Sequence, residues 1–282
     1  MFAPMLKVEL KKLYRLTLLW IELGALAGVI VIVFGGAFAA RIAGIFPNGS
    51  IDALITWPQS LDYSLTFVTG QAFGALIVML LASVGVAQEY QWGTYGLWLR
   101  QGASRTTILA AKFIAMLGAI VALTLTALVT GGLLSAVSTL VLQGGLNVSQ
   151  VNLIQMALSI LRTVYSLLPY LSMSFLIAVL TRSTAWSLGA GAAYALVIEG
   201  PLTQVLMFAI GGLPAKIAMW LPGPMSLAIV DINSTLATTS ATEVVGGPQY
   251  LPPEVAAMGI AAYTLVFLSL AFWNFVRKDI PG

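Results

Sequence analysis

Apolar runs long enough to cross a lipid bilayer recur along this 282-residue chain. About 20 apolar residues of α-helix span the hydrocarbon core, because each residue rises about 1.5 Å and lipid offers no partners for unpaired backbone groups. Six runs meet this requirement: residues 17–40, 65–87, 107–130, 157–180, 185–209 and 255–276. The expected fold class is an all-α membrane protein with six transmembrane helices, and residues 1–282 form a single transmembrane domain.

Composition supports a membrane protein and excludes several kinds of activity. Charged residues make up 8% of the chain, against about 25% in an average soluble domain. Histidine and cysteine are absent, which excludes the common zinc sites, thiol nucleophiles and histidine-based triads. No Gly-Lys-Ser/Thr phosphate loop is present, so the chain carries no ATP-hydrolysing motif of its own. We expect no enzyme activity, no metal site, no cofactor and no nucleic-acid partner.

The distribution of basic residues predicts the orientation, because cytoplasmic loops are enriched in Lys and Arg. If both termini are cytoplasmic, ten of the 13 basic residues lie on that side: Lys7, Lys11, Lys12, Arg15, Arg100, Arg105, Lys112, Arg182, Arg277 and Lys278. The other three, Arg41, Arg162 and Lys216, lie outside. We therefore expect both termini in the cytoplasm.

Residues 1–16 predict a separate amphipathic helix before the first transmembrane helix. Lys7, Lys11 and Arg15 recur every four residues and share one face. A second face carries leucine: Leu6, Leu10 and Leu13. Such a helix is expected to lie in the inner membrane interface with its basic groups near anionic headgroups. The alternative is an ordinary basic flank of the first transmembrane helix.

The connector QEYQWGTYGLWLRQGASR, residues 88–105, is rich in aromatic residues and glycine. A helix is expected through most of it, although Gly93 and Gly96 each weaken it by up to about 1 kcal/mol. Glycine also lets another backbone approach closely, and aromatic side chains supply contact area at modest entropic cost. Ser104 is expected to cap the next transmembrane helix. The connector predicts either a docking surface for a partner or a helix lying on the membrane.

This connector resembles the signature of type-2 ABC transporter permeases. The similar positions are an acid, a Gly-Thr pair, a leucine, a glycine-containing turn, Ser-Arg and a lysine: Glu89, Gly93, Thr94, Leu97, Gly102, Ser104, Arg105 and Lys112. The turn Leu-Thr-Arg-Ser-Thr-Ala at 180–185 is also similar to that family. The plan of an interfacial helix, six spans and an apolar outer segment is similar over essentially the whole chain. Many members have proline where this chain has residues 100–103, so the match is incomplete there.

The resemblance implies that residues 88–105 form a cytoplasmic coupling helix seated in a groove of a separate ATPase subunit, which would bind ATP and magnesium. The residues expected to carry this contact are Glu89, Tyr90, Trp92, Gly93, Thr94, Leu97, Arg100 and Arg105. One set of six spans makes a half-transporter. A second permease copy or a related permease, and two ATPase subunits, are therefore the implied partners, together with membrane lipid.

Two carboxylates, Glu22 and Glu199, fall inside expected transmembrane helices. An unpaired charge there costs a few kcal/mol or more, so each is expected to be protonated, paired or in a wet cavity. Pro201 removes a helix hydrogen bond beside Glu199 and predicts a kink. Glu22, Glu199 and Pro201 are therefore candidate pathway or gate residues. The alternative is structural pairing: Glu199 with Arg162 or Lys216, and Glu22 with a base at the inner rim such as Lys112.

The segment 211–253 is the longest break between apolar runs and is expected on the extracytoplasmic side. Its prolines and glycines exclude a continuous helix. Because residues 217–221 and 225–230 remain apolar, we expect short re-entrant helices that dip into the outer interface before the sixth transmembrane helix.

These features predict the permease subunit of an ATP-driven exporter in a prokaryotic plasma (inner) membrane. The apolar composition favours an amphipathic or hydrophobic cargo such as a peptide, a lipid or a drug-like compound, since a pathway for ions would be more polar. One alternative is an ion-gradient-driven secondary transporter, for which an inverted repeat would be typical. A second alternative is a non-transporting scaffold or sensor subunit that binds a partner through residues 88–105.

Overall fold

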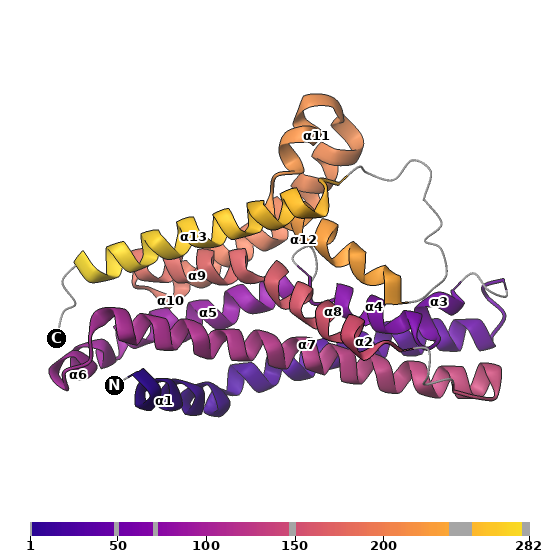
Figure 1. Cartoon of the computed structure of the whole chain (residues 1–282), viewed down its shortest axis with the longest axis horizontal. Helices are drawn as coiled ribbons and strands as arrows, with labels where there is room; N and C mark the ends of the chain where they lie inside the picture. Colours follow the sequence, from indigo (N-terminus) through magenta and orange to yellow (C-terminus); the bar gives the residue numbers. More distant parts are fainter. Residues whose placement is uncertain (1, 48–50, 70–72, 147–150, 237–249, 278–282) are drawn as a thin grey trace.

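The computed structural model describes residues 2–47, 51–69, 73–146, 151–236 and 250–277, and in these ranges every regular element is a helix (Figure 1). The α-helices are α1 (Phe2–Arg15), α2 (Thr17–Ile42), α3 (Asp52–Ile55), α4 (Gln59–Thr66), α5 (Phe73–Gln91), α6 (Thr94–Arg100), α7 (Arg105–Gln143), α8 (Leu153–Ser166), α9 (Leu168–Thr181), α10 (Thr184–Ala193), α11 (Gly212–Ala218), α12 (Pro222–Val230) and α13 (Pro253–Arg277). Two π-helices, η2 (Tyr194–Leu202) and η3 (Val205–Ile210), follow α10, and the 3-10 helix η4 (Asp231–Leu236) follows α12.

Six stretches of helix in the described chain are long and apolar enough to span a membrane. They are Thr17–Ile42, Phe73–Gln91, Arg105–Gln143, Leu153–Thr181, Thr184–Met207 and Pro253–Arg277. Each overlaps one of the six runs expected from the sequence, so the predicted number and order of these helices are confirmed. The pair Gly212–Ala218 and Pro222–Asn233 would add a seventh only if its two parts, bent by 72°, were counted as one span.

Two of the six helices differ from the sequence expectation at one end. The second begins at Phe73 rather than near residue 65, because residues 59–66 form the separate helix α4, which packs against α7. The third, α7, continues well past residue 130 to Gln143, where Gly144 ends it in the left-handed conformation at φ 74°. Its 39 residues extend over about 58 Å, against about 30 Å for a bilayer core. The C-terminal part of α7 therefore extends beyond the length that a bilayer core requires, and α4 packs against this part.

Small residues bring α4 and α7 together. A Cβ atom on Gly131 would collide with the side chain of Ser64, and one on Gly132 would press on Leu61. About two turns further along, the Thr139 hydroxyl oxygen of α7 accepts a hydrogen bond of 2.8 Å from the Trp57 backbone N–H. The close approach of these two helices therefore depends on glycine at position 131.

Replacing Gly131 with leucine is expected to force α4 away from α7. Overpacking of a close contact typically costs about 1–3 kcal/mol, so the melting temperature in detergent should fall by several degrees. Gly36→Leu on α2 is the matched control, because no atom lies near the position of an added Cβ there. Equal melting temperatures for the two variants would contradict the described contact.

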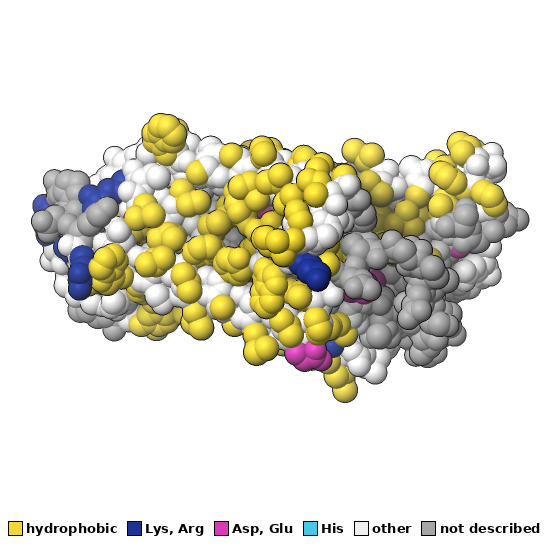
Figure 2. Space-filling model, turned by 90° about the horizontal axis from the view of Figure 1, so that it is seen from above, with side chains coloured by type: hydrophobic (Ala, Val, Ile, Leu, Met, Phe, Trp, Pro, Cys, Tyr) yellow, Lys and Arg dark blue, Asp and Glu magenta, His cyan; other side chains and the backbone are white. Residues whose placement is uncertain are grey.

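The described part of α1 begins, and that of α13 ends, at the end of the molecule where α6 lies, which we call the α6 end (Figure 1). Lys and Arg side chains gather at this same end, whereas hydrophobic side chains are spread along the middle of the face seen in Figure 2. Between the ends, α9 lies against both α5 and α13, and its Tyr170 and Phe175 are fully buried. The arrangement places α1, α6 and the start of α7 together.

Two expected interruptions of helix are present in the structure. Pro201 lies inside η2, whose π-helical turns accommodate a missing i→i−4 hydrogen bond, while the kink expected there stays a prediction. The segment 211–253 contains the short helices α11 and α12, as its prolines and glycines predict. Their position in a membrane interface stays a prediction. Residues 237–249 of this segment and Lys278 lie outside the described residues.

Candidate functional site

Four charged side chains meet inside the protein near the α6 end and form what we call the charge cluster. Glu9 and Lys12 come from α1, Glu89 from α5 and Lys112 from α7. The Lys112 ammonium lies 2.7 Å from a carboxylate oxygen of Glu9 and 2.7 Å from one of Glu89. The Lys12 ammonium lies 2.9 Å from oxygens of the same two residues. Two acids and two bases thus join three helices.

The charge cluster is largely shielded from solvent. Glu9, Glu89 and Lys112 are 3%, 6% and 1% exposed, whereas Lys12 is partly exposed. Burial alone would lower the pKa of Lys12, but the carboxylates of Glu89 and Glu9 outweigh it and raise that pKa above its usual value. Removing one partner from a buried ion pair is costly, because the remaining charge has lost its hydration and gains nothing in return. The cluster therefore holds α1 against α5 and α7, since separating these helices would separate its charges.

The short helix α6 is separated from α5 by Gly93, which adopts the left-handed conformation at φ 65°. Glycine takes this conformation without the strain that a Cβ atom would add. Tyr95 then anchors α6 to the interior, where its hydroxyl donates to the Val86 carbonyl oxygen at 3.1 Å. Its ring centre lies 4.7 Å from that of Tyr90 and 5.1 Å from that of Phe275. Complete burial raises the pKa of Tyr95 well above its usual value, so this anchor remains a neutral hydrogen-bond donor.

The opposite side of α6 and the turn before it are exposed. Trp92 is 64% exposed and Leu97 is 51% exposed, and Gly93 and Arg100 are exposed beside them. Trp98, half-buried at the edge of this surface, has its ring centre 5.1 Å from the Lys12 ammonium. The contacts of Tyr95 and of the charge cluster therefore fix α6 from within, while Trp92 and Leu97 remain exposed on its other side.

The eight residues predicted for coupling divide into two groups. Four are exposed at the α6 end: Trp92, Gly93, Leu97 and Arg100. Four are buried or half-buried: Glu89, Tyr90, Thr94 and Arg105. Glu89 in particular turns its carboxylate to Lys12 and Lys112, so it is used inside the protein and not at the surface.

The expected helix over residues 88–105 is present only in parts. It consists of the last turn of α5, the break at Gly93, the helix α6 and a turn that leads into α7. The predicted cap of α7 is confirmed, because the Ser104 hydroxyl oxygen accepts a hydrogen bond of 3.2 Å from the Thr107 backbone N–H.

Two further segments contact this region. Arg105 donates a hydrogen bond of 2.9 Å to the Val276 carbonyl oxygen near the end of α13. The Arg182 guanidinium lies 5.6 Å from the ring centre of Tyr90, and the Thr184 hydroxyl donates to the Gln91 side-chain oxygen at 3.1 Å. The two stretches on which the resemblance was based, residues 88–105 and 180–185, therefore contact each other.

The sequence interpretation did not identify Glu9. Met5, Glu9 and Leu13 form the buried face of α1, whereas Leu10, expected on the apolar face, is exposed. The available signal was the spacing of Glu9, four residues from both Met5 and Leu13, which places an acid on a face otherwise apolar. Such an acid needs a buried cation, and Lys112 supplies it.

Glu22 has no such cation. It is buried in α2, and neither of its carboxylate oxygens has a hydrogen-bond partner in the part of the chain that the structure describes. The expected pairing of Glu22 with Lys112 is wrong, because Lys112 is held by Glu9 and Glu89.

Glu199 lies in η2 and is also buried. The Tyr194 hydroxyl donates a hydrogen bond of 2.6 Å to its Oε1 atom. The expected pairing of Glu199 with Arg162 or Lys216 is wrong, since no salt bridge joins Glu199 to either base among the described residues. A pathway or gate role for Glu22, Glu199 and Pro201 stays a prediction.

A family model described as a protein of unknown function, DUF2705, matches residues 58–281, which include α4 to α13. No curated protein matches the chain.

Proposed function

We propose that this chain, which belongs to the DUF2705 family, is the membrane-spanning permease subunit of an ATP-driven ABC exporter. In this proposal the exposed side of α6 docks on a separate ATPase subunit, which binds the ATP and magnesium. The observation that carries the proposal is the exposed pair Trp92 and Leu97, presented at the α6 end on a helix that is fixed from within.

The exposed side of α6 has the composition of a protein contact. Tryptophan and arginine are both enriched among the residues that contribute most of the binding energy at protein interfaces. Trp92 and Arg100 supply both residue types, and Gly93 leaves room for a partner backbone to approach. These features support a groove-docking role more directly than the carboxylate of Glu89, which is used internally.

The contacts behind α6 support transmission of a partner's movement. Tyr95 joins α6 to α5 and α13, Arg105 joins the start of α7 to the end of α13, and the charge cluster joins α5 and α7 to α1. A displacement of α6 would therefore act on four helices that extend from the α6 end. This provides the mechanical connection that the resemblance to type-2 permeases implies.

The proposed orientation places the α6 end in the cytoplasm of a prokaryotic cell, in agreement with the gathering of Lys and Arg there (Figure 2). The α1 helix would then lie in the inner interface with Lys7 and Lys11, both exposed, toward anionic headgroups. A working transporter would contain two permease copies, or this chain with a related permease, and two ATPase subunits. The apolar composition favours an amphipathic or hydrophobic cargo.

Site-directed crosslinking tests this proposal, because the chain has no natural cysteine. Trp92→Cys would be coupled to a maleimide photo-crosslinker in inverted membrane vesicles, with Trp220→Cys on the outer segment as the matched control. We expect mass spectrometry to identify an ATPase with a phosphate loop at position 92 and none at position 220. Labelling of Trp92→Cys by a membrane-impermeant maleimide in intact cells would overturn the proposal, since no cytoplasmic ATPase could then reach α6.

A further inference from the structure

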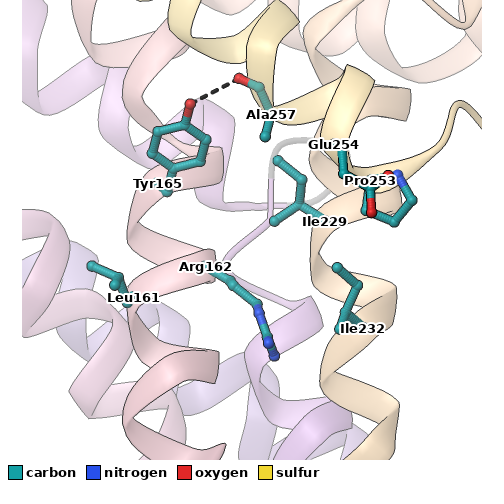
Figure 3. A pocket seen from close by; sticks show the side chains of 8 residues that line it. All are labelled: Leu161, Arg162, Tyr165, Ile229, Ile232, Pro253, Glu254 and Ala257. Carbon is teal, nitrogen blue, oxygen red and sulfur yellow. Dashed lines mark hydrogen bonds between the residues drawn. The ribbon is translucent and has the colours of Figure 1, made fainter.

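A cavity lies between α8, α12, η4 and the start of α13 (Figure 3), and these elements lie away from α6 (Figure 1). Its volume is about 420 Å³. Five of its lining residues are aliphatic or proline: Leu161, Ile229, Ile232, Pro253 and Ala257. The remaining three carry polar groups: Arg162, Tyr165 and Glu254. The Tyr165 hydroxyl is already used, because it donates to the Ala257 carbonyl oxygen at 2.8 Å.

The two charged residues stand on different walls of the cavity. Arg162 belongs to α8 and Glu254 to α13 (Figure 3), and no salt bridge joins them in the described chain. The one hydrogen bond of Arg162 to another described residue goes to the Asn233 side-chain oxygen at 3.3 Å. A guanidinium has five N–H donors, and among the described residues the Asn233 oxygen engages one of its nitrogens. The cavity is therefore lined by one cation and one anion on different helices, with apolar side chains making up most of the remaining wall.

The position of the cavity corresponds to the edge of a bilayer. Glu254 is the second residue of α13, whose 25 residues are apolar enough to span a membrane. The ends of such a helix lie where the hydrocarbon core meets the lipid headgroups. Leu161, on the opposite wall, is mostly exposed, so the cavity has an apolar rim on the outer surface of the protein. A lipid could enter from the side with its acyl chains along this rim.

We propose that this cavity binds the headgroup of a zwitterionic phospholipid, independently of the proposed ATPase docking. The lipid phosphate pairs with Arg162, the lipid ammonium lies toward Glu254, and the acyl chains follow Leu161 and Ile229. A headgroup with a net negative charge would satisfy Arg162 but would meet repulsion from Glu254. Complementary placement of opposite charges selects between such ligands more strongly than apolar area does.

Native mass spectrometry of the full-length protein in detergent tests this site. The protein would be titrated with dioleoyl-phosphatidylethanolamine and, separately, with dioleoyl-phosphatidylglycerol, which has the same acyl chains but no ammonium. We expect the ethanolamine lipid to be retained at least about tenfold more strongly, the scale of one charge-assisted contact. Equal retention of the two lipids, or stronger retention of the anionic lipid, would overturn the proposal.

Two variants separate the roles of the charges. Arg162→Gln should weaken retention of the ethanolamine lipid about tenfold, whereas Glu254→Gln should remove the difference between the two lipids. Lys216→Gln on α11 is the control, because that base is exposed and does not line the cavity. Ala257→Phe fills the cavity and leaves both charges in place, and it should abolish retention of the ethanolamine lipid. Retention unchanged by all three cavity substitutions in monodisperse protein would place the lipid elsewhere.

Discussion

Replacing Lys112 with methionine is expected to lower the free energy of unfolding by about 3–5 kcal/mol, the usual cost of removing one partner from a buried ion pair. Methionine keeps much of the length of the side chain but removes its charge. The carboxylates of Glu9 and Glu89 would then share Lys12 alone, and one negative charge would remain uncompensated. For a protein of this size we expect a melting temperature in detergent that is lower by about 6–15 °C.

Two control variants make the result specific. Lys7→Met removes an exposed charge from the same α1 helix and should leave the melting temperature nearly unchanged. The double variant Lys112→Met with Glu9→Gln restores a neutral cluster of Lys12 and Glu89, so it should recover part of the lost stability. If the single Lys112 variant melted like the wild type, the charge cluster would not hold the three helices together as described.

Replacing Trp92 and Leu97 together with alanine is expected to weaken binding of the ATPase subunit about 100-fold, without a change in melting temperature. Truncation of a central interface residue commonly costs about 2 kcal/mol or more, which is about thirtyfold for Trp92 alone. Both side chains are mostly exposed in this chain, so their removal leaves the interior intact. The dissociation constant would be measured between the purified ATPase, identified by crosslinking, and the permease in lipid nanodiscs.

The segment 211–253 offers a matched control for this pair. Trp220 and Leu213 are also exposed but belong to the region of α11, so their replacement with alanine should leave ATPase binding unchanged. Glu89→Gln should show the opposite pattern, because its carboxylate contacts Lys12 and Lys112: reduced stability with retained binding. A Trp92 and Leu97 double variant that binds as tightly as the wild type would move the docking surface away from α6.

The six long helices could be predicted because lipid imposes a simple requirement on sequence. A run of apolar residues that must pair its own backbone groups becomes a helix whatever surrounds it. The same requirement could not predict where a helix ends when protein, and not lipid, surrounds it. The C-terminal part of α7 contains Gly131, Gly132 and several hydroxyl residues, which interrupt an apolar run, yet the helix continues and α4 packs on this surface.

The candidate site could be predicted only in part, for a different physical reason. Exposure of Trp92 and Leu97 agrees with the idea that residues 88–105 present a contact surface, which local composition suggested. The ion pairs could not be assigned, because Lys112 and Glu9 are separated by 103 positions in the chain and several carboxylates were available to that lysine. The incorrect choice of Glu22 followed from its position inside an expected transmembrane helix, which hydropathy indicates, whereas the actual partner of Lys112 depends on how α1 packs against α7.

The length of α7 has a geometric consequence for motion. Its 39 residues form one helix with no proline between Arg105 and Gln143, so it resists bending and behaves as a rod. A rod of about 58 Å that tilts by about 10° around its midpoint shifts each end by about 5 Å in opposite directions. A small displacement of the Arg105 end would therefore reappear, opposite in direction and equal in size, at the Gln143 end.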